Sequence, residues 1–237
     1  MCTITFVPVS EKSNQFILTS SRDESAGRKT YFPKLYTENG IKLIYPKDAV
    51  AGGTWIAVSE KKRVICLMNG GFEKHVRKPF YAKSRGLVLK DLLVADNFHT
   101  AAEAYDLAEV EPFTMVVAQW QSELSLTEFV WDGTHKHLKE LPLKPYIWSS
   151  SPLYSSEMKK MREKWFQEFQ KSKEFTPEAL LDFHFSAGKG DKNVGLVMDR
   201  GFVKTKSVSQ IVIFEEQANF YYNDLEKDEE TQSNLKI

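Results

Sequence analysis

Short runs of β-branched and aromatic residues open the chain and alternate with polar turns. Residues 3–9 and 15–19 each predict a strand, and the polar residues 11–14 between them predict a turn. Two strands joined by so short a connection predict a β-hairpin at the start of the chain. Residues 20–29 are polar and show no regular alternation, so they predict irregular chain.

The same β pattern returns further along the chain. Residues 54–58 and 64–68 flank a charged turn, and the Asn-Gly-Gly run at 69–71 ends the second of these strands. Further strands are predicted for residues 113–120, 124–131, 137–141, 195–198, 208–214 and 219–222.

Apolar residues at helical spacing predict helices over residues 83–94 and 100–107. A longer helix is predicted to begin at Ser155 or Ser156 and to run to about residue 171. Its apolar stripe consists of Met158, Met161, Trp165 and Phe169. Thr176 followed by Pro177 predicts the start of a fourth helix, because proline is favoured at the first helical position.

The order of the predicted elements is strands, helices, strands, helices, strands. Few of them form a strand–helix–strand unit, so the pattern favours a layered α+β fold with largely antiparallel sheets. No repeat, low-complexity tract or linker divides residues 1–225, which we predict to be a single domain. Residues 226–237 are rich in charge and predict a flexible tail.

Composition narrows the classes of function. The 237 residues carry 32 basic and 32 acidic side chains, and the net charge of zero argues against a nucleic-acid-binding protein. The beginning of the chain lacks the pattern of a secretory signal, and no apolar run approaches the roughly 20 residues of a membrane span. Two cysteines are too few for a disulfide scaffold. We therefore expect a cytoplasmic protein without a membrane span.

Cys2 is the first candidate for chemistry. Removal of the initiator methionine before this small residue would place a free α-amine and a thiol on one residue. An α-amine has a pKa of about 7.7–8.0 and is partly neutral near pH 7.5, so it can accept the thiol proton. The simpler alternative is a small apolar residue at the start of a strand.

Three further polar residues follow predicted strands. The first hairpin would bring Arg22 and Asp23 close to Cys2, where a guanidinium favours a thiolate and a carboxylate can hold a protonated amine. The alternative is a solvated loop of mixed charge. Asn69 could donate to an oxyanion, although Asn-Gly is also a common turn signal.

The remaining chemistry-bearing residues give no further motif. The five histidines, which we expect at the surface or in turns, show no three-ligand metal pattern, and no phosphate-binding loop or serine-nucleophile motif is present. We therefore expect neither a metal nor a cofactor. The histidines are His75, His99, His135, His137 and His184.

Several short segments together resemble the NRDE family, the family of transport and Golgi organisation protein 2 and its bacterial relatives. The family's Asn-Arg-Asp-Glu motif reads Ser21-Arg22-Asp23-Glu24 here, with serine in place of the first residue. The Ser84-Arg85-Gly86 run resembles the start of a family helix. The other segments are MCTITF at 1–6, GGTWIAVS at 52–59 and LMNGG at 67–71.

This family in turn resembles the N-terminal-nucleophile hydrolases of the choloylglycine hydrolase and penicillin V acylase branch. The resemblance implies a four-layer αββα sandwich and cleavage of a linear amide or related acyl bond by Cys2, assisted by Arg22, Asp23 and Asn69. The resemblance also implies that Trp55, Ser150 and Lys206 bind the substrate. Ser150 and Lys206 stand where the branch usually has Asn and Arg.

The resemblance also leaves a second function open. It implies links to haem handling and lipid homeostasis, so the protein could instead be a non-catalytic binding or trafficking protein for an apolar ligand. The expected partner is therefore a small acyl or amide substrate or an apolar ligand, and the sequence leaves oligomerisation open. The aromatic residues that could line such a cavity are Trp55, Phe72, Phe80, Tyr81 and Trp148.

Overall fold

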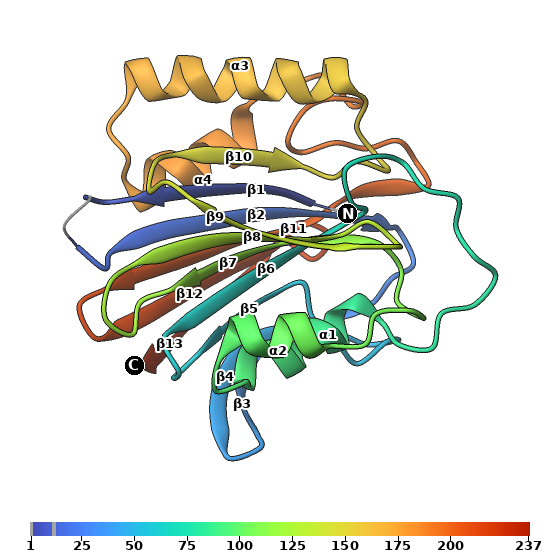
Figure 1. Ribbon diagram of the computed structural model, residues 1–237. Coiled ribbons are helices and arrows are strands. Elements are labelled where there is room, and N and C mark those ends of the chain that lie inside the picture. Colours follow the sequence, from blue (N-terminus) through green and yellow to red (C-terminus); the bar gives the residue numbers. More distant parts are fainter. Residues whose placement is uncertain (1, 11–12) are drawn as a thin grey trace.

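A computed structural model describes residues 2–10 and 13–237 of the chain. Two antiparallel sheets pack face to face, and helices cover the outer face of each, which gives four layers (Figure 1). The predicted α+β class and αββα sandwich are confirmed. Met1 and part of the predicted turn at residues 11–14 lie outside the described residues.

The first sheet has the strand order β10-β1-β2-β11-β12-β13. The predicted hairpin at the start of the chain is confirmed, and β1 and β2 are both interior strands of this sheet. Its strands are β1 (Cys2–Pro8), β2 (Phe16–Ser25), β10 (Tyr146–Ser149), β11 (Val203–Phe214), β12 (Gln217–Asp224) and β13 (Glu229–Lys236).

The strands of the second sheet follow one another in sequence order from β3 to β9. Every neighbouring pair is antiparallel. Its strands are β3 (Thr30–Glu38), β4 (Ile41–Asp48), β5 (Ile56–Ser59), β6 (Arg63–Asn69), β7 (Phe113–Gln119), β8 (Ser125–Trp131) and β9 (Lys136–Leu141).

Four helices form the outer layers. α1 (Arg85–Val94) and α2 (Phe98–Ala104) lie on the second sheet, and α3 (Ser156–Ser172) and α4 (Pro177–Ser186) lie on the first (Figure 1). Ser84, Ser155 and Thr176 cap α1, α3 and α4 with side-chain oxygens that accept backbone N–H groups. These caps satisfy N–H groups that have no partner inside the helix.

Side chains of β1 alternate between two packing layers. Cys2, Ile4 and Phe6 face the core between the sheets, whereas Val7 packs beneath α3 and α4. Both faces of β1 are therefore covered, and the start of this strand lies deep inside the molecule.

Three sequence predictions are wrong. β2 continues to Ser25, although residues 20–29 were expected to be irregular, because the polar side chains at 20–23 are buried between layers. Residues 195–198 form no strand. The expected flexible tail instead contains β13, which pairs with β12 along its whole length and buries Leu235.

Candidate active site

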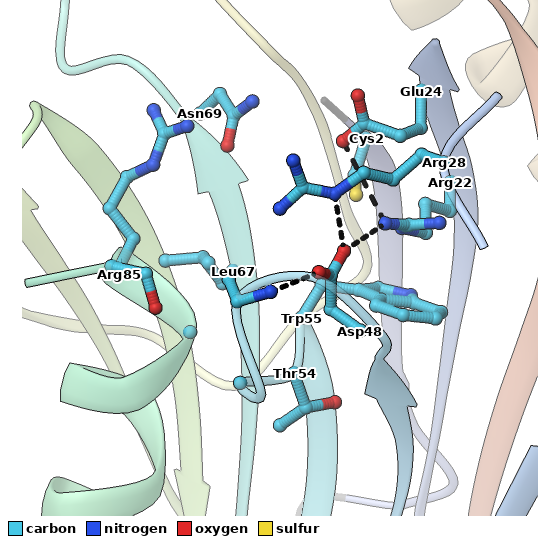
Figure 2. A pocket seen from close by; sticks show the side chains of 14 residues that line it. Cys2, Arg22, Glu24, Arg28, Asp48, Thr54, Trp55, Leu67, Asn69 and Arg85 are labelled. Atoms are coloured by element: carbon cyan, nitrogen blue, oxygen red, sulfur yellow. Dashed lines mark hydrogen bonds and ion pairs between the residues drawn. The ribbon is translucent and has the colours of Figure 1, made fainter. Parts of the chain in front are cut away.

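A small cavity opens beside the first residue of β1, between the two sheets and the start of α1 (Figure 2). Its volume is about 100 Å³. A wider cavity of about 670 Å³ adjoins it and shares Glu24, Arg28, Ala51, Asn69, Ser84 and Arg85 with it. We refer to them as the inner and the outer cavity. The inner cavity is also lined by Cys2, Arg22, Asp48, Gly53, Thr54, Trp55, Leu67 and Gly86.

The thiol of Cys2 lies at the inner cavity. Cys2 pairs with Arg22 across β1 and β2, so both side chains are on the face that looks toward the second sheet. Burial raises the pKa of the Cys2 thiol, the charge of Asp23 raises it further, and Arg22 opposes the shift. The thiol is therefore protonated at neutral pH, and a nucleophilic role requires a base beside it.

Arg22 is held by a network of ionic and aromatic contacts. Its Nη2 donates to Asp48 Oδ2 at 3.0 Å, and its Nη1 donates to Thr30 Oγ1 at 3.0 Å. The guanidinium carbon lies 4.1 Å from the ring centroid of Trp55. Because these three contacts fix the guanidinium of Arg22, its positive charge can act on the inner cavity without a large movement of the side chain.

Asn69 ends β6 and lines both cavities. The hydroxyl of Ser150 donates to the backbone carbonyl of Asn69 at 2.9 Å, and the backbone N–H of Ser150 donates to the carbonyl of Cys2 at 3.1 Å. Ser150 thus connects the first residue of β1 with the last residue of β6. Gly70 follows with φ +86°, and a Cβ there would lie 2.4 Å from Pro152, so only glycine fits this turn.

Asp23 faces the opposite side of β2 and does not line either cavity. Its carboxylate accepts hydrogen bonds from Tyr154 Oη at 2.6 Å and from Thr205 Oγ1 at 2.7 Å. Burial raises the pKa of Asp23, while the charge of Arg162 and these two hydrogen bonds favour the ionised form. Asp23 therefore belongs to a buried polar layer between the first sheet and its helices.

His184 belongs to the same layer, contrary to the expectation that all five histidines are exposed or in turns. It is fully buried on α4, and its two ring nitrogens contact Thr5 Oγ1 at 2.9 Å and Ser21 Oγ at 2.8 Å. Burial, with a smaller effect of Arg162, lowers the pKa of His184 to about 3. This histidine is neutral at physiological pH.

Several residues predicted to bind the substrate or an apolar ligand lie away from both cavities. Lys206 donates to the carbonyl of Ala26 at 2.6 Å and forms an ion pair with Glu226, and it lines neither cavity. The five aromatic residues also do not share one cavity: Trp55 lines the inner cavity, and Phe80 and Tyr81 line the outer one. Phe72 instead packs against His137, and Trp148 donates to Glu128.

Sequence patterns missed three cavity residues, Arg28, Asp48 and Arg85. Asp48 ends β4 and accepts from both Arg22 and Arg28, and Arg85 begins α1 (Figure 2). Of the three, only Arg85 belongs to a motif noted in the sequence, the Ser-Arg-Gly run at 84–86. These three side chains come together because a loop of the second sheet approaches α1 closely. The approach leaves no room for a side chain at Gly86, where a Cβ would lie 2.6 Å from the carbonyl oxygen of Thr54.

Among residues 2–10 and 13–237, no group of three His, Cys, Asp or Glu side chains is arranged to hold a metal ion. In the same described part of the chain, no helix has the length and apolar character that crossing a membrane would need.

The layer order and topology are those of the N-terminal-nucleophile hydrolases. Conjugated bile acid hydrolase from Clostridium perfringens matches with a TM-score of 0.54 and 10% identity over 99% of this chain and 92% of that one. A family model described as Transport and Golgi organisation 2 matches residues 1–221, and the chain belongs to that family.

Two other solved structures show the same fold. Penicillin V acylase from Agrobacterium tumefaciens has a TM-score of 0.54 and 11% identity over 98% of this chain and 85% of that one. A Caenorhabditis elegans orthologue of N-acylethanolamine-hydrolyzing acid amidase has a TM-score of 0.55 and 11% identity over 89% and 92%. No curated protein sequence matches the chain.

Proposed function

We propose that the protein is a cysteine hydrolase that cleaves a linear amide, or a related acyl bond, after removal of Met1. The observation that carries this proposal is the position of Cys2. Its thiol reaches a small polar cavity that also contains a side-chain amide, Asn69, and a fixed guanidinium, Arg22. Similarity of fold to amide-cleaving enzymes supports the same reaction class.

The reaction begins with proton transfer within one residue. Once Met1 is removed, the neutral α-amine of Cys2 accepts the proton of its own thiol. Arg22 favours the thiolate, which offsets part of the effect of burial on the pKa of Cys2. Cys2 pairs with Arg22 in the antiparallel register, and Asp23 is the next residue of β2. Asp23 is therefore on the side toward the backbone nitrogen of Cys2, where its carboxylate helps to hold the protonated amine.

The thiolate then attacks the carbonyl carbon of the substrate, and the carbonyl oxygen becomes an oxyanion. The side-chain amide of Asn69 donates to this oxyanion. Collapse of the intermediate breaks the C–N bond, and the α-ammonium group returns its proton to the leaving amine. Water then cleaves the thioester, which releases the carboxylic acid and restores the thiol. Ser150 holds the backbone carbonyl of Asn69 in place during these steps.

The first test is the mass of the N-terminal peptide of the purified protein. We expect Met1 to be absent and Cys2 to carry a free amine. If Met1 is retained, the amine is blocked and the self-activating mechanism is wrong. Binding of an apolar ligand such as haem or a lipid then becomes the leading proposal, and a haem absorbance titration tests it.

The second test is hydrolysis of a panel of N-acyl amides. We expect Cys2→Ala and Cys2→Ser to reduce kcat by at least about 100-fold, since each removes the nucleophilic thiol. Cys66→Ala is the matched control, because Cys66 is an equally buried cysteine in the same core and does not line the cavities. Equal activity of the Cys2 variants and the wild type would refute the proposal.

A further inference from the structure

The turn at residues 150–154 contacts two parts of the candidate site. Ser150 at its start donates to the backbone carbonyl of Asn69, behind the proposed oxyanion donor. Tyr154 at its end donates its hydroxyl to Asp23 Oδ2 at 2.6 Å. The backbone N–H of Tyr154 also donates to the carbonyl of Ser150 at 3.1 Å, which fixes the two ends of the turn to each other. One short segment therefore supports both the oxyanion donor and the carboxylate that we propose to hold the amine.

The phenol of Tyr154 is buried and held in one orientation. The guanidinium carbon of Arg162 lies 3.6 Å from the ring centroid, and that of Arg200 lies at 5.4 Å. Arg200 also donates to the carbonyl of Leu153 at 3.1 Å, which fixes the backbone next to the tyrosine. Two positive charges near the ring and a carboxylate at the hydroxyl leave the phenol little freedom to rotate.

Tyr154 connects the buried charges of Arg162 and Asp23. Arg162 donates to the backbone carbonyls of Val194 and Gly195 at 2.9 and 2.8 Å, and no carboxylate in the described part of the chain forms an ion pair with it. Its charge nevertheless favours the ionised form of Asp23. The ring of Tyr154 lies against the guanidinium, and its hydroxyl contacts the carboxylate. Removal of this hydroxyl would therefore break the connection and leave both charges in place.

Asp23 is well placed to act on the start of β1. It lies one residue beyond the β2 partner of Cys2, and its charge adds to the effect of burial in raising the pKa of the Cys2 thiol. The neighbouring carboxylate, Glu24, is on the cavity side and pairs with Arg22 at 3.7 Å. From α4, the neutral ring of His184 contacts hydroxyl groups of other residues. Asp23 accepts from two neutral hydroxyls, which orient its charge without cancelling it.

We propose that Tyr154 is a positioning residue whose hydroxyl orients the Asp23 carboxylate toward the α-amine of Cys2, so that this amine takes and returns the thiol proton. This inference rests on the proposed function. Tyr154 lines neither cavity, so it acts through Asp23 and not on the substrate. Because Ser150 belongs to the same turn, the groups for proton transfer and for oxyanion binding are held by one segment.

The test is Tyr154→Phe, which removes the hydroxyl and keeps the ring against Arg162. The rate at which iodoacetamide alkylates Cys2 is followed across pH from the mass of the N-terminal peptide, so the result does not depend on turnover. A carboxylate that is held less firmly stabilises the ammonium less and disfavours the thiolate less. Both effects should move the alkylation profile to lower pH, by roughly 0.5–1 unit. The kcat for amide hydrolysis should fall by roughly 10- to 100-fold, the range for a hydrogen bond to a charged group.

Asp23→Asn separates an effect through the carboxylate from a general change of packing. This variant alone should also move the profile to lower pH, and Tyr154→Phe added to it should move the profile little further. Tyr146→Phe is the matched control. Tyr146 lies on β10 of the same sheet, and within the described residues its hydroxyl forms no hydrogen bond, so its removal should leave the profile unchanged.

Three results would each overturn the inference: an unshifted profile in a folded Tyr154→Phe protein, an unshifted profile in Asp23→Asn, or a Tyr154→Phe shift of full size in the Asp23→Asn background. In these cases hydrolysis that depends on Cys2 would still support the proposed function. A profile that shifts as expected in a protein that hydrolyses none of the amides would instead support the role of Tyr154 and refute the hydrolase proposal.

Discussion

The buried histidine of α4 makes the stability of the fold depend on pH. Folding moves His184 from water into a layer where its ring nitrogens contact two hydroxyl groups and where the nearby charge is that of Arg162. A protonated ring would need to donate from both nitrogens beside a guanidinium. The folded protein therefore binds this proton far less readily than the unfolded chain does.

The size of the effect follows from the two pKa values. The unfolded value is about 6.5, and the folded value is about 3. Because the folded pKa is the lower one, the unfolded state binds more protons below pH 6.5, and stability falls as the pH falls. Between pH 7 and pH 5 His184 should reduce the free energy of unfolding by about 2 kcal/mol.

Urea unfolding at pH 7 and pH 5 measures this loss. Other groups titrate as well, so the loss is compared between the wild type and His184→Gln, and the difference isolates the histidine. His135→Gln, at a histidine that is 73% exposed, serves as the control. If His184→Gln loses as much stability as the wild type between the two pH values, the buried neutral histidine is the wrong explanation.

Three other predictions concern the packing that builds the site. Gly86→Ala would place a Cβ 2.6 Å from the backbone of Thr54, so it should lower the free energy of unfolding by about 1–3 kcal/mol in urea denaturation; an unchanged midpoint would contradict this. Removal of residues 226–237 exposes the edge of β12 and the apolar surface that Leu235 covers. It should lower the Tm by roughly 4–8 °C in calorimetry, whereas removal of a flexible tail would leave the Tm unchanged. Arg162→Met leaves the carbonyls of Val194 and Gly195 unpaired and the buried charge of Asp23 uncompensated. It should lower the free energy of unfolding by about 3–5 kcal/mol, whereas Lys160→Gln on the same helix, the control, should leave it nearly unchanged.

Local patterns were sufficient where a residue's role depends on its sequence neighbours. The apolar spacing over residues 83–94 predicted α1, and the Thr-Pro pair predicted the start of α4, because both signals are local. Cys2 and Arg22 were predicted to meet because a short hairpin determines which residues pair. The Asn-Gly-Gly run likewise predicted the end of β6, where Asn69 lies.

Interactions between distant segments could not be derived in this way. The strand alternation places Arg22 and Asp23 on opposite faces, but the sequence does not say which layer covers each face. The partners of His184 lie 179 and 163 residues away along the chain, and Asp23 pairs with Thr205 across 182 residues. Polar residues are stable inside a sheet when such partners satisfy them, so β2 continues through residues that look like a loop.

The residues of β1, β2 and β6 that carry the candidate chemistry, and the family to which the chain belongs, were therefore determined by the sequence alone. Only the tertiary structure decided that Arg28 and Asp48 join them, that Lys206 does not, and that β13 completes the first sheet. The physical reason is that a side chain's neighbours across a layer depend on how whole sheets and helices pack, and not on its neighbours along the chain.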